Sequence, residues 1–425
     1  MLILVTVILL AFGLAMGFSA SFVNGKTGLE QLFDQLRFVA IGFALIGVMM
    51  LAGYKVFSAN RDIWFVAVSA LWLLSLVCMA LVFVPGLGVE VNGASRWLDL
   101  GPLPQFQPSE FAKLTLLLYS AAAIERYRYS QSRLLFAAIV FSYVALIAMT
   151  LLQKDLGSTM LLHLAFLAVL WFAEIPILAK GLKGLVSMAS LIGIPAAFMA
   201  ATYFLPSYRQ SRWAGFMSPL DTEALTVGLK DADQIRNGFL ALGGGNIQGL
   251  GFGLSKQKYF YLSFPHSDYI YAIVGEELGL IGALAVLLLF LAFAWFGLRI
   301  ARNAVSPQGK MLAGGATSLI VFQALVNIGG VTGALPLTGK PLPFFSIGGS
   351  SMVFTLCIVG CILLVAWFDA WQGIAVQRRD AFRLVDGGLP VGAGNAGRQP
   401  KGQPQGQPLG RRIAPPPLTA TARRR

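Results

Sequence analysis

Long apolar stretches, separated by short polar segments, make up the chain from its first residue to about residue 370. An apolar stretch of about 20 residues is long enough to cross a bilayer as an α-helix. Such stretches predict ten membrane-spanning helices, at about residues 1–20, 38–54, 62–84, 109–124, 134–151, 157–174, 184–204, 268–297, 312–335 and 350–370. The pattern therefore predicts an all-α, polytopic membrane protein.

Composition supports this interpretation and excludes an ordinary soluble domain. Of the 425 residues, 56% are hydrophobic and only 12% are charged, and the mean hydropathy is +0.72. Soluble domains carry about 25% charged residues. Because Cys78, Cys357 and Cys361 all lie in apolar spans, we interpret them as small core residues and expect neither disulfides nor a metal site.

The distribution of lysine and arginine predicts the orientation of the spans, because short cytoplasmic loops retain positive charge. With both termini inside, ten basic residues fall in short inner loops and five in short outer loops. The inner set is Lys55, Arg61, Arg126, Arg128, Arg133, Lys180, Lys183, Arg299, Arg302 and Lys310, and the outer set is Lys26, Arg37, Arg96, Lys154 and Lys340. The net charge of +13 follows this topology, and such scattered charges argue against nucleic-acid binding.

Composition changes near residue 370 and predicts two regions. Residues 1–370 form the predicted membrane domain. Residues 371–425 form a predicted cytoplasmic tail, basic and mostly disordered, because its Gly, Pro, Gln and Arg residues cannot bury a core. Its last three arginines, Arg423–Arg425, are candidates for contact with anionic membrane lipid. Two outer loops, at about 85–108 and 205–267, are long enough to carry function.

The clearest candidate chemistry lies in the run SKQKYFYLSFPHSDYIYAIVGEELGLIG, where the larger outer loop enters a span. Acidic residues near membrane depth are costly and commonly functional. Asp268 lies at the boundary, where a carboxylate with a raised pKa can act as a general base; a helix cap is the alternative. We interpret His266 as its hydrogen-bonding neighbour and as a candidate substrate contact. Glu276 and Glu277 are about 100° apart around the helix, so we expect structural contacts in different directions.

Further candidates lie earlier in the larger outer loop. Arg209 and Arg212 are either exposed loop charges or bidentate partners for a diphosphate. The glycines between 243 and 253 predict turns, since no Lys-Ser or Lys-Thr pair completes a phosphate loop. Lys258 adds positive charge near the membrane surface and is a candidate substrate contact.

Two polar segments outside this loop also carry candidates. Glu110 and Lys113 are three residues apart and share a helix face, just after Pro108 at a predicted helix start. They form either a structural charge pair or the polar wall of a substrate cavity, with Lys113 near a phosphate; the two interpretations are compatible. Asp155, in QKDLGST, is either a helix N-cap or a substrate contact.

With these residues in view, the chain resembles the SEDS family of bacterial cell-wall proteins, which includes FtsW and RodA. The resemblance rests on four blocks in the family's order. They are NGASRWLDLG with FQPSEFAKL, QKDLGST, SKQKYFYL with HSDYIYAIVGEELGLIG, and NIGGVTGALPLTGKPLPFFSIGGSS. The segments FQPSEFAKL and SKQKYFYL favour FtsW and cell division, with RodA and elongation as the alternative. The family's fold is a helical bundle with a large extracytoplasmic loop.

The resemblance implies a peptidoglycan glycosyltransferase that polymerises lipid II at the outer face of the bacterial cytoplasmic membrane. Asp268 matches the family's essential aspartate and would deprotonate the acceptor sugar hydroxyl. Arg96, Lys113 and Arg212 resemble substrate-binding positions. The implied partner is a class B penicillin-binding protein, a transpeptidase. No cofactor is implied with certainty, and a divalent cation is compatible with the reaction.

Two other functions fit a membrane bundle with polar residues in its interior. One is a transporter that flips lipid II across the membrane, and the other is a non-catalytic scaffold for a transpeptidase. An acidic residue at the outer boundary favours chemistry over both.

Overall fold

The computed structural model describes residues 1–21, 28–59, 61–91, 94–99, 101, 104–173, 230–259, 261–262 and 265–385. The predicted span at 184–204, Arg209, Arg212 and the tail beyond residue 385 lie outside this part of the chain. The chain divides into two compact units, Met1–Gln372 and Gly373–Arg425. The first unit holds the candidate residues that the structure describes.

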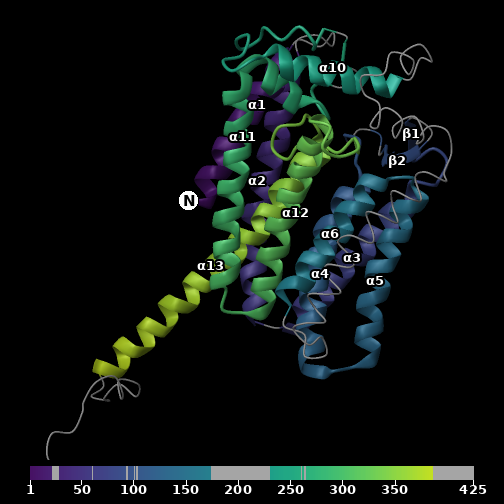
Figure 1. Cartoon of the computed structure of the whole chain (residues 1–425). Helices are drawn as coiled ribbons and strands as arrows, with labels where there is room; N and C mark the ends of the chain where they lie inside the picture. The colour runs from purple at the N-terminus through teal and green to yellow at the C-terminus, as the bar shows by residue number, and fades with distance from the viewer. Residues whose placement is uncertain are drawn as a thin grey trace, which may run out of the picture. The chain divides into compact units, whose positions relative to one another are not determined.

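Long helices build the first unit (Figure 1), and nine of those in the described ranges match nine of the ten predicted spans. They are α1 (Leu2–Ser21), α2 (Gly28–Ala59), α3 (Arg61–Leu81), α4 (Pro108–Ser130), α5 (Arg133–Leu152), α6 (Leu156–Phe172), α11 (Ile270–Asn303), α12 (Pro307–Val331) and α13 (Gly349–Val385). Seven helices of the described residues are long and apolar enough to cross a membrane. The helical, polytopic membrane fold is therefore confirmed.

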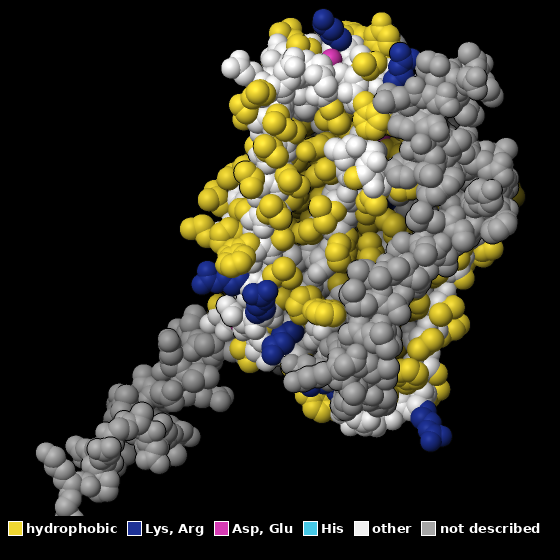
Figure 2. All heavy atoms as spheres, viewed as in Figure 1, with side chains coloured by type: hydrophobic (Ala, Val, Ile, Leu, Met, Phe, Trp, Pro, Cys, Tyr) yellow, Lys and Arg dark blue, Asp and Glu magenta, His cyan; other side chains and the backbone are white. Residues whose placement is uncertain are grey.

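The two remaining helices of this set, α4 and α6, lie inside the bundle. α12 packs against α4, α6 and α11, and 78% of its apolar window is buried, whereas α3 and α5 bury only 22% of theirs. Figure 2 shows the consequence on one face: hydrophobic side chains cover the middle, and Lys and Arg lie toward the two ends. A bilayer can therefore solvate the middle, while α4 and α12 keep their polar side chains within protein.

N-terminal contacts confirm two predictions, Pro108 at the start of α4 and Asp155 as the N-cap of α6, and show a cap at Ser306 that was not predicted. Pro108 occupies the first turn of α4, where its missing N–H is not needed. Asp155 is the N-cap of α6 and accepts a hydrogen bond from Ser158 N at 3.1 Å. Ser306 caps α12 and accepts from Gly309 N at 2.9 Å. These caps supply partners to backbone N–H groups that a helix start leaves unpaired.

One element in the first outer loop was not predicted. Strands β1 (Gly88–Val91) and β2 (Ala94–Leu98) form an antiparallel hairpin, and Leu98 also pairs with Phe106 just before α4. The sequence carries a signal for it, because Asn92-Gly93 stands between the strands and Asn-Gly is a strong hairpin-turn dipeptide. This hairpin is a small addition to the all-α fold that the sequence predicts.

The larger outer loop also contains a helix that was not predicted, α10 (Lys230–Gly244). Figure 1 shows it lying across the end of the bundle, near the start of α11. Ala241 is fully buried, and Gly238 faces the ring of Tyr269, because a Cβ at this glycine would lie 2.9 Å from Tyr269 Cε1. This part of the loop therefore packs directly against the residue that follows Asp268.

Gly279 breaks α11, with φ 66° and ψ −165°. Such a break in a span needs substitute hydrogen-bond partners for the backbone. The loop at 246–251 supplies them: Leu250 N and Gly251 N donate to Glu276 O and Glu277 O at 3.0 and 2.9 Å, and Leu280 N donates to Asn246 O at 2.9 Å. The glycines predicted as turns therefore also hold the loop against the broken helix.

Gly279→Ala is expected to lower the stability of the fold by about 2–3 kcal/mol, because this backbone conformation is open almost only to glycine. A Cβ there would also lie 2.4 Å from Gly249 N and Ile247 O, both backbone atoms. Thermal unfolding in detergent measures the effect. Gly243→Ala is the matched control, since its Cβ would meet nothing within 4 Å. Equal melting temperatures for the two variants would contradict the prediction.

Candidate functional site

Asp268 lies in the turn at 265–269 that leads into α11. Its side chain is half-buried, and Ser267 Oγ donates to Asp268 Oδ1 at 3.0 Å. The N-cap position of α11 belongs to Tyr269, not to Asp268. The carboxylate thus stands at the end of a broken, membrane-spanning helix and retains access to solvent.

A buried amide on α12 fixes the backbone beside this carboxylate. Asn327 Nδ2 donates to Asp268 O at 2.9 Å and to Lys340 O at 2.8 Å. The amide is only 3% exposed, so both hydrogen bonds are shielded from water. Asn327 therefore ties the Asp268 turn to the segment that follows α12.

The segment 342–347 forms the other side of the Asp268 turn. Ser346 Oγ donates to Ser267 O at 2.7 Å, and Ile347 N donates to His266 O at 2.9 Å. Phe344 in this segment has φ 68°. The carbonyl of Phe344 packs against Gly13 of α1, where a Cβ atom on residue 13 would lie only 2.1 Å from Phe344 O. Backbone contacts therefore hold the turn rigidly on two sides.

Asp155 forms a buried ion pair with Lys340, at 2.8 Å between Lys340 Nζ and Asp155 Oδ1. Ser158 Oγ also accepts from Lys340 Nζ, at 2.6 Å. Burial alone would raise the pKa of the Asp155 carboxyl, but Lys340, Arg96 and the hydrogen bonds hold it well below its usual range. The Asp155 carboxylate therefore holds the Lys340 side chain in place. The backbone carbonyls of Lys340 and Asp268 both accept hydrogen bonds from the Asn327 amide.

Glu110 and Lys113 form a second buried ion pair, at 2.8 Å, with both side chains 1% exposed. Lys113 Nζ also donates to Gln323 Oε1 at 2.7 Å, and Gln323 Nε2 donates to Pro341 O at 3.0 Å. The charge-pair interpretation is therefore confirmed. Through Gln323, the pair supports the same segment that carries Lys340.

The structure thus joins three of the predicted residues, Glu110, Lys113 and Asp155, to the Asp268 turn. The links are residues that were not predicted as part of a site: Gln323, Asn327 and Lys340. Two of them could have been identified from the sequence, because Gln323 and Asn327 are polar residues within an apolar span, and such residues are commonly functional.

Two further candidates lie around this centre. Arg96 Nη2 donates to Lys154 O at 2.7 Å, while Arg96 Nε is buried and finds no hydrogen-bond partner among the described residues. His266, two residues before Asp268, is half-buried; burial lowers its pKa, and the Asp268 carboxylate opposes the shift. The imidazole is therefore biased toward its neutral form, which can donate and accept hydrogen bonds.

Lys258 lies apart from this centre, in a third buried ion pair with Glu277 at 3.0 Å. Its ammonium also donates to Gly253 O at 2.8 Å and to Ser19 Oγ at 3.2 Å. An ammonium has three donors, and three protein acceptors take them. These contacts give Lys258 a structural role between α1, α11 and the loop, and its predicted contact with substrate stays a prediction.

Glu276 holds the same loop from the neighbouring position on α11. Its carboxylate accepts from Ser255 Oγ at 2.5 Å and from Lys256 N at 2.9 Å, while Glu277 Oε1 accepts from Ser255 N at 3.3 Å. The prediction of structural contacts is confirmed, but the expectation of different directions is wrong. Both carboxylates contact Ser255, because the loop that carries Ser255 packs against this part of α11 and the two long Glu side chains reach the same residue from adjacent positions.

Lys258→Met is expected to lower stability by about 3 kcal/mol, because it leaves the Glu277 carboxylate buried without its cation. The melting temperature in detergent measures this. Lys256→Met is the control, since Lys256 is exposed in the same loop. If Lys258→Met has the same melting temperature as the wild type, the ion pair does not stabilise the fold. The substrate-binding interpretation of Lys258 is then favoured.

No group of three or more His, Cys, Asp or Glu side chains in the described ranges could hold a metal ion. The predicted compatibility with a divalent cation stays a prediction.

Comparison with known proteins gives a family. The model of the FtsW/RodA/SpoVE family, described as cell cycle protein, matches residues 1–370. Stage V sporulation protein E of Bacillus subtilis is 33% identical over 384 residues, covering 87% of this chain and 97% of that protein. A probable peptidoglycan glycosyltransferase FtsW of Geobacter sp. strain M18 is 35% identical over 375 residues, covering 86% and 95%.

Solved structures agree with the sequence comparison. Rod shape determining protein RodA of Thermus thermophilus has a TM-score of 0.60 at 26% identity, covering 86% of this chain and 95% of RodA. A chain from a study of the structural coordination of polymerization and crosslinking by a peptidoglycan synthase complex has a TM-score of 0.61 at 26% identity, covering 85% and 96%. The chain therefore belongs to the FtsW/RodA/SpoVE family, the SEDS proteins.

Proposed function

We propose that the chain is a peptidoglycan glycosyltransferase that polymerises lipid II into glycan strands, for cell division or elongation. The observation that carries this proposal is the Asp268 carboxylate, half-buried and held in a hydrogen-bonded frame at the end of a membrane-spanning bundle. Relatives that cover nearly the whole chain are named for this activity. The active site faces outward from the bacterial cytoplasmic membrane.

In the proposed reaction, Asp268 takes the proton from the acceptor sugar hydroxyl as the hydroxyl oxygen attacks the anomeric carbon of the donor. A glycosidic C–O bond forms, and the C–O bond to the diphosphate breaks. Undecaprenyl diphosphate leaves with the electron pair. A positioned general base accounts for a rate factor of about 10²–10⁴.

Substrate binding is proposed for the polar side chains around Asp268. Arg96 has a buried Nε–H with no acceptor in the described part of the chain, and a guanidinium suits a diphosphate. Arg212 is a second candidate for this role. Glu110, Lys113 and Asp155 act mainly through their buried pairs, which hold the segment 340–347 in place.

The proposed partner is a class B penicillin-binding protein, which crosslinks the strands. The similarity to a chain of a peptidoglycan synthase complex that coordinates polymerization and crosslinking supports this partner.

The test uses the purified chain with its transpeptidase partner and labelled lipid II. Wild-type protein is expected to produce glycan strands that a muramidase degrades. In lipid vesicles, a flippase would move lipid II between leaflets without making strands. A scaffold would neither make strands nor move lipid II. Translocation without strands, or the absence of both activities, would contradict the proposal.

A further inference from the structure

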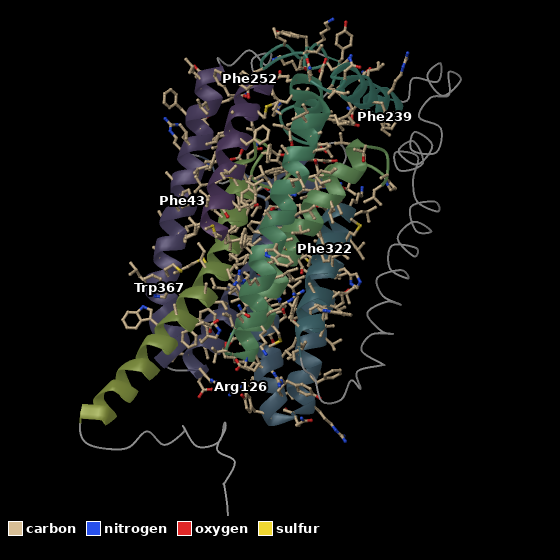
Figure 3. The ribbon with its side chains drawn as sticks, turned by 60° about the vertical axis from the view of Figure 1, so that its left-hand side comes forward. Phe43, Arg126, Phe239, Phe252, Phe322 and Trp367 are labelled. Atoms are coloured by element: carbon tan, nitrogen blue, oxygen red, sulfur yellow. The ribbon has the colours of Figure 1, made fainter. Side chains whose placement is uncertain are left out.

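A cavity of about 640 Å³ lies at the opposite end of the bundle from Asp268. It is lined by the start of α3, the end of α4 and the first turn of α12, whereas Asn327 near the other end of α12 contacts Asp268. At 1.5 Å per residue, about 30 Å of helix separates these two ends. Figure 3 shows Arg126 of this cavity at the end away from Phe239 and Phe252.

Glu125 is the innermost charged group of this cavity and is only 6% exposed. With the Gln308 amide oriented to suit its neighbours, Gln308 Nε2 donates to Glu125 Oε2 at 2.8 Å. Glu125 Oε1 has no hydrogen-bond partner within the described ranges, and Arg61 Nη2 is 3.6 Å away, beyond hydrogen-bond distance. Arg61 thus forms an ion pair with this oxygen without a hydrogen bond, so a ligand with an N–H group can supply the hydrogen bond that the buried oxygen lacks.

Two arginines stand at the mouth of the cavity. The guanidinium of Arg61 lies 5.6 Å from the ring centroid of Tyr129, and that of Arg126 lies 5.0 Å from that of Phe65. Both side chains are largely exposed, and Arg126 also pairs with Asp62. The mouth can therefore bind a phosphate, while the interior presents the Glu125 carboxylate, whose Oε1 is ion-paired with Arg61 and accepts no hydrogen bond within the described ranges.

An apolar groove of about 530 Å³ continues from the cavity. It shares Phe65, Arg126 and Ser130 with the cavity and runs between α3, α4 and α5 past Trp72 and Ala138. Only 22% of the apolar window is buried in each of α3 and α5. The groove therefore opens toward the hydrocarbon region of a bilayer, and the cavity opens at its polar edge.

We propose that the cavity and the groove together bind one phospholipid with an ethanolamine headgroup. Its phosphate binds Arg61 and Arg126, its ammonium donates to Glu125 Oε1, and an acyl chain lies in the groove. A choline headgroup has no N–H to donate. An anionic headgroup without an amine has no N–H to donate and leaves Glu125 Oε1 without a hydrogen bond. The site is separate from the Asp268 centre and does not depend on the proposed reaction.

The experiment measures lipid binding to the delipidated full chain in detergent by native mass spectrometry. Phosphatidylethanolamine, phosphatidylcholine and phosphatidylglycerol with identical acyl chains are compared. The ethanolamine lipid is expected to bind at least about tenfold more tightly than the other two, the factor for one charge-assisted hydrogen bond. Glu125→Gln is expected to remove this preference, and Glu30→Gln, an exposed glutamate on α2, to retain it.

A second variant tests the groove independently. Ala138→Phe is expected to weaken all three lipids by a similar factor and to keep the headgroup preference. Soluble glycerophosphoethanolamine, which has the headgroup without acyl chains, is expected to compete poorly. Melting temperatures show which variants remain folded; if Glu125→Gln does not fold, the wild-type headgroup comparison still decides.

Three results would overturn the proposal. One is equal binding of the three lipids by the wild type. Another is an ethanolamine preference that survives in folded Glu125→Gln. The third is competition by glycerophosphoethanolamine at the concentration of the intact lipid, which would assign the cavity to a small soluble ligand.

Discussion

Asp268→Asn is expected to lower the rate of glycan polymerisation by about 10²–10⁴-fold, the range for removal of a general base. The substitution keeps the size of the side chain, and the Asn amide oxygen can still accept the bond from Ser267 Oγ. The contact from Asn327 goes to the backbone carbonyl of residue 268 and is unaffected. The fold should therefore persist while the proton acceptor is lost, and single-turnover rates with labelled lipid II measure the difference.

Asp99→Asn is the matched control for this variant. Asp99 is exposed, and Asp99 Oδ1 accepts from Gly101 N, a bond that the Asn oxygen can also accept. We expect this variant to polymerise at the wild-type rate. If folded Asp268→Asn retains more than about a tenth of wild-type activity, Asp268 is not the base, although the chain could still be the polymerase through another group.

Lys340→Met is expected to lower stability by about 3–5 kcal/mol and to reduce polymerisation as well. The substitution leaves Asp155 buried without its ion-pair partner, which is the costly outcome for a buried charge. The Asn327 amide donates to the carbonyls of both Lys340 and Asp268, so displacement of the segment that carries Lys340 reaches the Asp268 turn. Melting temperature and polymerisation rate at a temperature where the variant is folded measure the two effects.

The double variant Asp155→Asn, Lys340→Met separates charge from position. Removing both charges should restore much of the stability that Lys340→Met loses, because the unpaired carboxylate is gone. Activity should recover less than stability, since Asp155 no longer positions the segment through Lys340. Equal stabilities for the single and double variants would show that the ion pair does not matter to folding.

The helical framework could be predicted because hydrophobic length reports a membrane span directly. Hydrophobic length alone does not explain one helix, α4, or the hairpin of β1 and β2. α4 carries Glu110 and Lys113 at the same helix face, and only its buried place in the bundle explains why such a polar helix is stable. The hairpin had a turn dipeptide, but a short strand pair contributes too little hydrophobic pattern to be recognised without it.

Asp268 could be predicted because it lies where a polar loop meets an apolar span. Ion pairs between residues far apart in the sequence could not be predicted. Lys340 looked like one more charge of an outer loop, yet its partner Asp155 lies 185 residues away in the sequence. Periodicity reports neighbours at three or four residues, so no local pattern can show such a pair. Tertiary packing alone brings these charges together.

The break at Gly279 constrains how chains of this kind can diverge. Glu276 and Glu277 contact Ser255 because the loop that carries Ser255 also packs against the break at Gly279, two to three residues further along α11. One inserted residue would rotate the preceding turn by about 100° and shift it by about 1.5 Å, and would carry Asp268 with it. Homologues should thus vary in residue type between Asp268 and Gly279 yet conserve the length of this interval, with insertions and deletions confined to other segments.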